Sequence, residues 1–342
     1  MVGFKSSLSK PIASTMTQKV FVTRKIPQEG LDMITGMFYV TTWPSEHPPS
    51  KEEIVEMAAD CQGLITLLSD TIDADMITNL PNLKVITQYA VGYDNIDVKE
   101  ATRRGIIVTN TPGVLTETTA DLTWSLIMAT ARRIVEADRY IRKGNWNVAW
   151  GPQLLLGADI YDATLGIIGM GRIGKAVARR AQGFNMRVLF HSRSHNESIA
   201  ALEELVGAQS TSLDTLLRES DIVSLHVPLT SATIHLIGEK ELGIMKKGSI
   251  LVNTSRGQVV DQDALYRALT SGHLGGAGLD VFTEEPIPKD SPLIGLPNVV
   301  LVPHIGSASK NTRATMATMC AKNIIAALNG ERPPNIVNPE VL

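Results

Sequence analysis

The sequence predicts an α/β protein built from two doubly wound parallel sheets with a cleft between them. The chain has 342 residues, which is more than one domain usually contains. Short apolar runs typical of buried strands alternate with helical patterns along most of the chain. One such run, residues 164–168, ends in glycines with the spacing G-x-G-x-x-G. We therefore expect one of the two domains to bind a dinucleotide.

The first third of the chain alternates between strand and helix patterns. Strands are expected at 20–23, 38–42, 63–67, 83–87 and 106–109, and helices at 28–35, 51–59, 73–80 and 95–104. Strands that alternate with helices form a parallel sheet covered on both faces.

A continuous helical pattern follows at residues 116–142, with Thr116, Thr118 and Thr119 as candidate caps. It is apolar over a wide arc up to Arg132, which predicts one long helix buried in its own domain or against a partner subunit. The loop after it is rich in tryptophan and glycine.

A second α/β series begins at residue 164. Its strands are expected at 164–168, 187–190, 222–226, 249–253, 275–280 and 299–302, with helices at 175–182, 213–218, 239–245 and 262–271. A last helix, expected at 310–328, follows this series. Six strands that begin with a glycine fingerprint describe a complete Rossmann-like unit.

The three glycines of the fingerprint have separate tasks. Gly169 suits a tight turn from strand to helix, Gly171 lets a pyrophosphate approach the backbone, and Gly174 lets the helix pack close to the strand. The start of the helix then offers N–H groups to the phosphates. An ordinary tight turn between a strand and a helix is the alternative.

Composition excludes several classes of function. The net charge of −3 gives no reason to expect nucleic acid or an acidic membrane surface as a partner. No apolar stretch approaches the roughly 18 residues of a membrane span. The two cysteines lie far apart in the sequence and predict neither a disulfide framework nor a metal site. We therefore expect a cytoplasmic protein without a metal, and the basic, serine-containing residues 1–17 leave an organelle-targeting tail as the alternative.

The residues after the second strand of the fingerprint unit predict which dinucleotide binds. An Asp or Glu about 20 residues after the glycines binds the ribose hydroxyls of NAD. The residues at that place are His191, Ser192, Arg193 and Ser194. Serine and arginine would instead bind a 2′-phosphate, which favours NADP(H). If Arg193 is an ordinary solvated residue, NAD(H) binds as well.

Three segments with candidate catalytic residues follow the ends of later strands, where doubly wound folds bind ligands. They carry Arg256, Glu285 and His304. Each residue alone would be interpreted as a loop charge, a solvated carboxylate or a core histidine. Their order and context together predict a site.

These segments and several others resemble the D-isomer-specific 2-hydroxyacid dehydrogenases over nearly the whole chain. The matching stretches are 90–97, 109–112, 166–174, 255–257, 278–282 and 303–306. Within the family the chain is most similar to the glyoxylate/hydroxypyruvate reductases, because the 91–95 loop and the Ser192–Arg193 pair are similar to theirs.

The resemblance implies a division of the chain and a reaction. Residues 1–116 and 308–342 would form a flavodoxin-like substrate domain, residues 117–307 a dinucleotide-binding domain, and the long helix the core of a homodimer. The enzyme would use NADPH to reduce small 2-keto acids such as glyoxylate and hydroxypyruvate to 2-hydroxy acids.

The resemblance also assigns the catalytic roles. His304 would protonate the carbonyl oxygen as the hydride arrives, and Glu285 would stabilise the cationic imidazole, with Glu284 as the competing choice. Arg256 would bind the substrate carboxylate and polarise the keto oxygen.

Other positions would surround substrate and cofactor. Val91 and Gly92 would donate backbone N–H groups to the substrate carboxylate. Leu68 and Trp150 would form the pocket wall, Trp150 from the other subunit, although both could be plain packing residues. The positions assigned to the cofactor are Gly169, Gly171, Arg172, Ile173, Gly174, Ser192, Arg193, Val227, Pro228, Thr233, Thr254, Ser255, Asp280 and Gly306.

Two further functions are compatible with these motifs. One is a broader 2-keto-acid reductase that includes 2-ketogluconate. The other is a dinucleotide-sensing corepressor of the C-terminal-binding-protein type, which shares the fold and can keep the three catalytic residues. The absence of an acid at residues 191–194 argues against an NAD(H) sensor. A phosphite oxidase of this family is disfavoured because Tyr89–Tyr93 lacks the lysine that such enzymes share.

Overall fold

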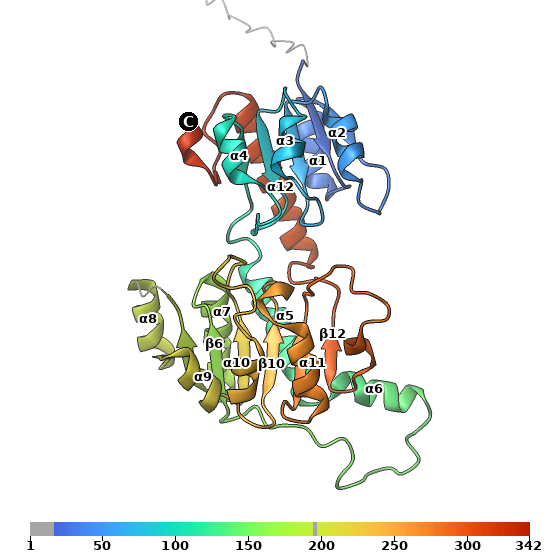
Figure 1. Cartoon of the computed structure of the whole chain (residues 1–342), viewed down its shortest axis with the longest axis vertical. Coiled ribbons are helices and arrows are strands. Elements are labelled where there is room, and N and C mark those ends of the chain that lie inside the picture. Colours follow the sequence, from blue (N-terminus) through green and yellow to red (C-terminus); the bar gives the residue numbers. More distant parts are fainter. Residues whose placement is uncertain (1–16, 194–196) are drawn as a thin grey trace, which may run out of the picture. The chain divides into compact units, whose positions relative to one another are not determined.

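The computed structural model describes residues 17–193 and 197–342, which fold as two compact units. Unit 1 contains the chain up to Pro112 together with Arg313–Leu342, and unit 2 contains Gly113–Thr312. Both units are α/β structures (Figure 1). The expected targeting tail lies almost wholly outside the described residues.

Unit 1 contains a parallel sheet. Its described strands are β1 (Lys19–Val22), β2 (Tyr39–Thr42), β3 (Gly63–Thr66), β4 (Val85–Gln88) and β5 (Ile107–Thr109). Their spatial order is β2-β1-β3-β4-β5, the flavodoxin-like order. Each neighbouring pair is parallel, so all carboxyl ends lie at one edge of the sheet.

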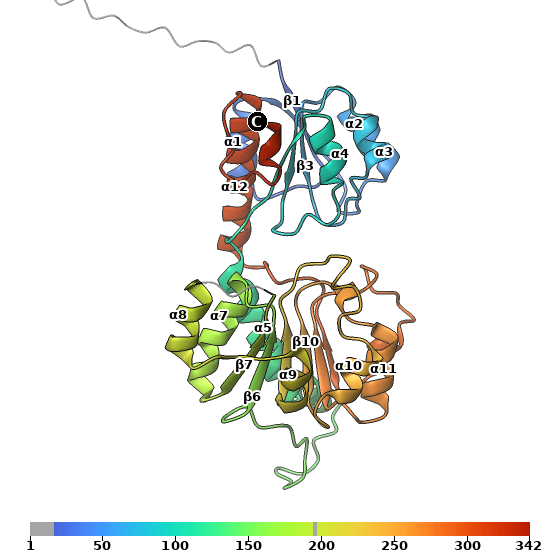
Figure 2. The same cartoon turned by 60° about the vertical axis from the view of Figure 1, so that its left-hand side comes forward.

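Helices cover both faces of this sheet (Figure 2). One face packs against α1 (Gln28–Thr35) and α12 (Lys310–Leu328), and the other against α2 (Lys51–Ala58), α3 (Ala74–Thr78) and α4 (Val98–Arg103). A Cβ on Gly30 would lie 2.5 Å from the carbonyl oxygen of Ala317, so glycine allows α1 and α12 to touch. The last helix of the chain therefore completes the core of the first unit.

The sheet of unit 2 is parallel as well. Its described strands are β6 (Thr164–Ile168), β7 (Arg187–His191), β8 (Gln209–Ser210), β9 (Ile222–Leu225), β10 (Ile250–Asn253), β11 (Gly276–Leu279) and β12 (Val299–Leu301). The order β12-β11-β10-β9-β6-β7-β8 is the Rossmann order with one strand added at an edge. Strand β8 was not expected from the sequence, because its two polar residues show neither an apolar run nor an alternation of apolar and polar residues.

Two apolar layers enclose this sheet (Figure 2). The first layer contains α5 (Thr116–Ala131), α7 (Arg172–Ala181) and α8 (Glu197–Val206), and the second contains α9 (Leu213–Glu219), α10 (Glu239–Ile244) and α11 (Gln262–Thr270). Val188 and Phe190 of β7 point into the first layer and Leu189 into the second, as the alternation of a strand requires. Helix α8 was also not expected from the sequence. Short 3-10 turns lie at Gln182–Phe184, Gly257–Val259, Pro292–Gly295 and Pro339–Val341.

The prediction of one long helix at residues 116–142 was wrong. The chain forms α5 and then a separate helix, α6 (Ile134–Arg142), because Arg133 adopts a left-handed conformation with φ = 53°. The Arg133 guanidinium donates to the Glu136 carboxylate at 2.8 Å and to the Leu156 carbonyl at 3.2 Å, which holds the break in place. Helix α5 buries eight residues, whereas α6 buries none.

The expected threonine caps of this helix were also wrong. The residue before α5 is Leu115, and no side chain caps the helix. Thr118 instead hydrogen-bonds to Thr312 at 2.6 Å, and Thr119 donates to the Gly306 carbonyl at 3.1 Å. The threonines therefore connect α5 to the chain at and just before the start of α12.

Among the described residues, no helix combines the length and apolar character needed to cross a bilayer. The same residues contain no cluster of His, Cys, Asp and Glu side chains suited to a metal ion.

Candidate active site

The glycine turn after β6 is forced by backbone contacts. Gly169 has φ = 97°, and a Cβ there would lie 2.5 Å from the carbonyl oxygen of His226. A Cβ on Gly174 would lie 2.2 Å from the carbonyl oxygen of Gly169. Both glycines are therefore required by packing of the turn against β9 and of α7 against β6.

Gly171 differs from the other two, because a Cβ at this position would meet no described atom within 4 Å. It is the residue before α7, and no side chain caps the helix or places an acid in its first turn. The first N–H groups of α7 are therefore open to an anion, which fits a pyrophosphate. Arg172 is exposed and Ile173 is half-buried in this first turn, which begins three residues earlier than expected.

The end of β7 carries no carboxylate in its described part. Ser192 is half-buried and Arg193 is exposed, and Ser194 lies outside the described residues. Up to residue 193, the residues that would lie beside the adenosine ribose of a bound dinucleotide are therefore polar or basic.

The segment after β9 forms a closed turn. The Thr233 hydroxyl donates to the Pro228 carbonyl at 2.7 Å and accepts the Thr230 N–H at 2.8 Å. Val227 packs against the glycine turn: a Cβ added to Gly169 would lie only 2.9 Å from Val227 Cγ1. Thr233 is 5% exposed, so this hydroxyl stabilises the turn itself.

The segment after β10 is held by an asparagine that the sequence analysis did not single out. Asn253 Oδ1 accepts the N–H and the hydroxyl of Ser255 at 3.0 and 2.8 Å, and Asn253 Nδ2 donates to the Arg256 carbonyl at 2.9 Å. Thr254 hydrogen-bonds to Thr123 of α5 at 3.0 Å. Arg256 is half-buried, and its guanidinium donates to the Ser255 carbonyl at 2.8 Å. An asparagine at a strand end, three residues before an arginine, was the available signal.

Gly257 brings the segments after β10 and β11 into backbone contact. A Cβ on Gly257 would lie 1.9 Å from the carbonyl carbon of Phe282, which no side chain permits. Gln258 also donates to the Thr283 carbonyl at 3.1 Å. The arginine segment and the glutamate segment are therefore fixed against each other.

His304 and Glu285 form a hydrogen-bonded pair. His304 Nδ1 donates to Glu285 Oε2 at 2.7 Å, and Glu285 Oε1 accepts the Phe282 N–H at 3.0 Å. Of the two candidate glutamates, Glu285 is thus the one that contacts the imidazole. His304 has φ = 51°, an uncommon conformation for a residue other than glycine.

Asp280 holds the segment that carries His304. Its Oδ1 accepts the Ile305 N–H at 2.6 Å and its Oδ2 accepts the Gly306 N–H at 2.9 Å, while its backbone carbonyl accepts the His304 N–H at 2.9 Å. Asp280 is 1% exposed. Both oxygens of the Asp280 carboxylate therefore bind the backbone of the histidine segment.

The two carboxyl groups beside His304 have opposite pKa shifts. Burial raises the pKa of Asp280 to about 6, against the effect of its two N–H donors. Burial also disfavours the charged form of Glu285. The hydrogen bond and charge of His304, the Phe282 N–H and the charge of Arg256 together outweigh burial and lower the pKa of Glu285 below its usual value. Glu285 therefore stays charged down to a lower pH than Asp280 does.

The residues predicted to surround the substrate belong to other segments of the chain. Leu68, Val91 and Gly92 belong to unit 1, in loops after β3 and β4, and all three are partly exposed. Trp150 lies in the segment after α6 and is 76% exposed. Within unit 2 the chain thus brings together Arg256, Glu285 and His304.

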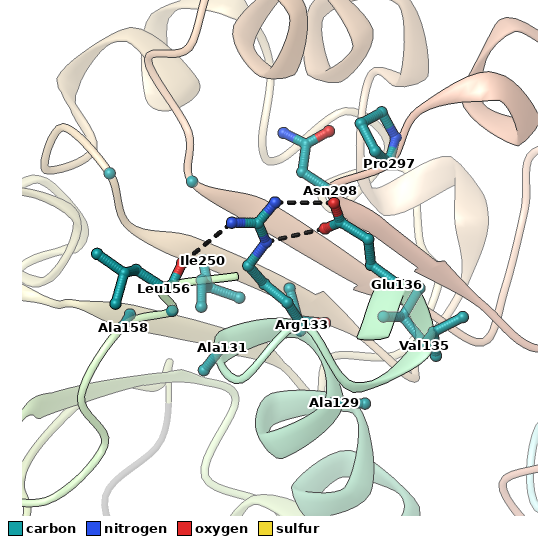
Figure 3. A pocket seen from close by; sticks show the side chains of 15 residues that line it. Ala129, Ala131, Arg133, Val135, Glu136, Leu156, Ala158, Ile250, Pro297 and Asn298 are labelled. Carbon is teal, nitrogen blue, oxygen red and sulfur yellow. Dashed lines mark hydrogen bonds and ion pairs between the residues drawn. The ribbon is translucent and has the colours of Figure 1, made fainter. Parts of the chain in front are cut away.

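A cavity of about 450 Å³ in unit 2 lies away from these residues. Figure 3 shows its lining, in which the Arg133 guanidinium lies between the Glu136 carboxylate and the Leu156 carbonyl. None of the predicted site residues lines it. It lies at the amino-terminal edge of the sheet, opposite the edge where β10 and β11 lead to Arg256 and Glu285.

Comparison with known proteins decides the family. Residues 124–306 match the model of the D-isomer specific 2-hydroxyacid dehydrogenase NAD-binding domain. A glyoxylate reductase of Korarchaeum cryptofilum (strain OPF8) is 59% identical over 327 residues, which cover 96% of this chain and 98% of the relative. The chain belongs to the D-isomer specific 2-hydroxyacid dehydrogenases.

Solved structures agree with this assignment. A protein of Thermus thermophilus superposes with a TM-score of 0.87 at 47% identity, covering 94% of this chain and 100% of that chain. An NADPH-dependent glyoxylate/hydroxypyruvate reductase from Sinorhizobium meliloti, in complex with NADP and malonate, superposes with a TM-score of 0.83 at 30% identity, covering 95% and 97%. This 2-hydroxyacid dehydrogenase is therefore an oxidoreductase that uses a nicotinamide dinucleotide and a small-molecule substrate.

We expect Asp280→Asn to change how the stability of unit 2 depends on pH. The carboxyl group titrates near pH 6 when folded and near pH 4 when unfolded, so the folded state binds the proton more tightly. As pH rises from about 4 to about 6, the wild type should therefore lose about 2–3 kcal/mol of stability relative to the variant. Urea titrations of both proteins across this range measure the difference. A difference that is constant with pH would contradict the assignment.

Proposed function

We propose that this dehydrogenase reduces glyoxylate, hydroxypyruvate and similar small 2-keto acids to 2-hydroxy acids, with NADPH as the preferred cofactor. The observation that carries the proposal is the 2.7 Å hydrogen bond between His304 and Glu285, beside the segment of Arg256. The curated relatives named glyoxylate reductase support the substrate class, at 49–59% identity over nearly the whole chain.

His304 is the general acid of the proposed reaction. Glu285 accepts from Nδ1, which leaves Nε2 of a cationic ring able to donate a proton to a keto oxygen. Because the pKa of Glu285 is lowered, the carboxylate stays charged at neutral pH and favours the cationic imidazole. The cofactor supplies the hydride that reduces the carbonyl carbon.

Arg256 and the loop after β4 would bind the carboxylate of the substrate. A guanidinium presents paired donors that match a carboxylate, and its charge also stabilises a developing alkoxide. Val91 and Gly92 would add backbone N–H donors from unit 1, with Leu68 as a wall residue. Unit 1 would then be the substrate domain and unit 2 the dinucleotide-binding domain. The division proposed from the sequence is 1–116 with 308–342 for the first and 117–307 for the second.

His304→Ala tests the reaction and the acid together. The wild type should oxidise NADPH when mixed with glyoxylate, and the variant should turn over about 10²–10⁴-fold more slowly, because the proton donor is lost. Loss of the absorbance of reduced cofactor measures turnover, and titration calorimetry should give nearly the same NADPH affinity for both proteins.

Glu285→Gln is the companion variant of this experiment, and it tests the charge of the carboxylate separately. Glutamine keeps a hydrogen-bond acceptor near His304 but removes the charge that stabilises the cationic ring. We expect kcat/KM to fall at the alkaline side of its pH profile, starting at lower pH than in the wild type. A wild type that binds NADPH and reduces no keto acid would reject the proposed function.

Ser192 and Arg193 support the preference for NADP(H), because a basic residue can bind the 2′-phosphate where NAD enzymes carry an acid. Arg193→Ala should therefore raise KM for NADPH about 10-fold and leave KM for NADH nearly unchanged. Arg172→Ala is the comparison variant. Arg172 lies in the first turn of α7, which is open to the pyrophosphate that both cofactors share, so KM should rise for NADH and NADPH together. Equal use of NADH and NADPH by the wild type would contradict the preference.

A homodimer is also part of the proposal. Large apolar side chains that follow α5 are exposed in the single chain: Ile134, Ile141, Trp146, Val148, Trp150, Leu154 and Leu156. Several large exposed apolar side chains along one segment of the chain indicate a protein interface. Trp150 would then reach the substrate pocket of the second subunit.

Trp146→Asp combined with Val148→Asp should convert a dimer to a monomer, because charged side chains would be buried in the interface. Light scattering coupled to size exclusion measures the mass. Tyr39→Asp, at an exposed apolar residue of unit 1, serves as the control and should remain dimeric. A monomeric wild type would contradict the dimer.

Two alternatives remain separable by experiment. A broader specificity would appear as comparable kcat/KM for 2-ketogluconate and glyoxylate. The corepressor alternative is not favoured, since relatives of nearly full length are named as reductases.

A further inference from the structure

We propose that Asn110 is a positioning residue, which orients the Gly92 N–H towards the carboxylate of the substrate. The inference rests on the proposed function, because it assigns a cause to the carboxylate-binding geometry of the loop after β4. Asn110 follows β5 in unit 1 and is 9% exposed. It acts through the backbone and does not itself need to contact the substrate.

The hydrogen bond that carries the inference runs from Asn110 Nδ2 to the Val91 carbonyl at 2.8 Å. In a trans peptide the carbonyl and the following N–H point in opposite directions within one plane. Holding the Val91 carbonyl towards Asn110 therefore turns the Gly92 N–H away from Asn110.

The preceding peptide is held in the same way. The Thr111 N–H donates to the Ala90 carbonyl at 2.9 Å, which turns the Val91 N–H away from residues 110–111. Two successive N–H groups thus face away from the β5 side of the loop. Among the described residues, neither N–H has a hydrogen-bond acceptor, and Val91 and Gly92 are partly exposed. An anion is the partner that such a pair of donors fits.

Asn110 is itself fixed by the last helix of the chain. Its backbone carbonyl accepts from Asn323 Nδ2 at 3.0 Å, and its N–H donates to the Asn335 carbonyl at 3.2 Å. Asn323 is fully buried in α12. The amide that orients the loop is therefore held before any substrate binds, as preorganised binding requires.

The opposite end of the loop is held by different side chains. Gln88 Nε2 donates to Asn95 Oδ1 at 2.7 Å and to the Gly92 carbonyl at 3.3 Å, and Asn95 Nδ2 donates to the carbonyls of Leu67 and Asp70 at 3.0 and 2.7 Å. These bonds tie the loop to its neighbour after β3. None of them contacts the Val91 carbonyl, so Asn110 has a separate task.

The test compares Asn110→Ala and Asn110→Asp with Asn338→Ala. Asn338 is likewise buried in unit 1 and bonds to the backbone of Val108 and Ile106, but not to the loop. Asn110→Asp keeps the size of the side chain and replaces the donor with an acceptor, so it covers the case in which the alanine variant fails to fold. We measure kcat and KM for glyoxylate, the affinity for oxalate with NADPH bound, and the melting temperature.

Both Asn110 variants should raise KM for glyoxylate and weaken oxalate binding about 10-fold or more, with kcat and NADPH affinity nearly unchanged. Asn338→Ala should lower the melting temperature without changing KM. The inference is overturned if Asn110 and Asn338 variants change KM equally, if neither changes it, or if kcat falls at constant KM.

Failure of the proposed function has a different signature. A wild type that reduces no 2-keto acid rejects the reaction, whereas oxalate titration still reports on Asn110. Equal oxalate affinity in the wild type and Asn110→Asp, or no oxalate binding by the wild type, overturns the inference directly.

Discussion

The contact between the backbones of Gly257 and Phe282 is the constraint on which the candidate site depends. Parallel strands deliver their carboxyl ends to one edge of the sheet, but strands lie almost 5 Å apart and do not by themselves bring their loops together. The absence of a side chain at Gly257 allows the two loops to touch. The main chain at Arg256 and the main chain of the glutamate segment are then fixed relative to each other.

Two carboxyl groups at this edge of the sheet, those of Asp280 and Glu285, have different environments. Asp280 accepts hydrogen bonds from the backbone N–H groups of residues 305 and 306, and burial raises its pKa. Glu285 accepts a hydrogen bond from His304, and its donors lower its pKa. One carboxyl group thus binds the backbone of the histidine segment, and the other accepts a hydrogen bond from the imidazole. Pairs of acids whose environments move their pKa values apart are characteristic of sites that transfer protons.

The sequence determined the architecture and supplied the candidate residues of the site. The alternation of strands and helices predicted both sheets, and the glycine spacing predicted the turn at Gly169, because these signals are local and each depends on a few neighbouring residues. Arg256, Glu285 and His304 could be found because parallel strands place the residues after them at one edge. The missed strand β8 and the expected continuous helix show the limit, since neither boundary is a local property.

Only the tertiary structure decided how these residues are held. The break at Arg133 depends on the carbonyl of Leu156, and the selection of Glu285 over Glu284 depends on a histidine 19 residues away. The bond from Asn110 to Val91 likewise joins residues that are distant in sequence. A hydrogen bond needs its donor and acceptor within about 3 Å, and chain spacing carries no such information. The sequence alone therefore identifies the candidate residues of the site, and tertiary packing determines the orientation of their side chains.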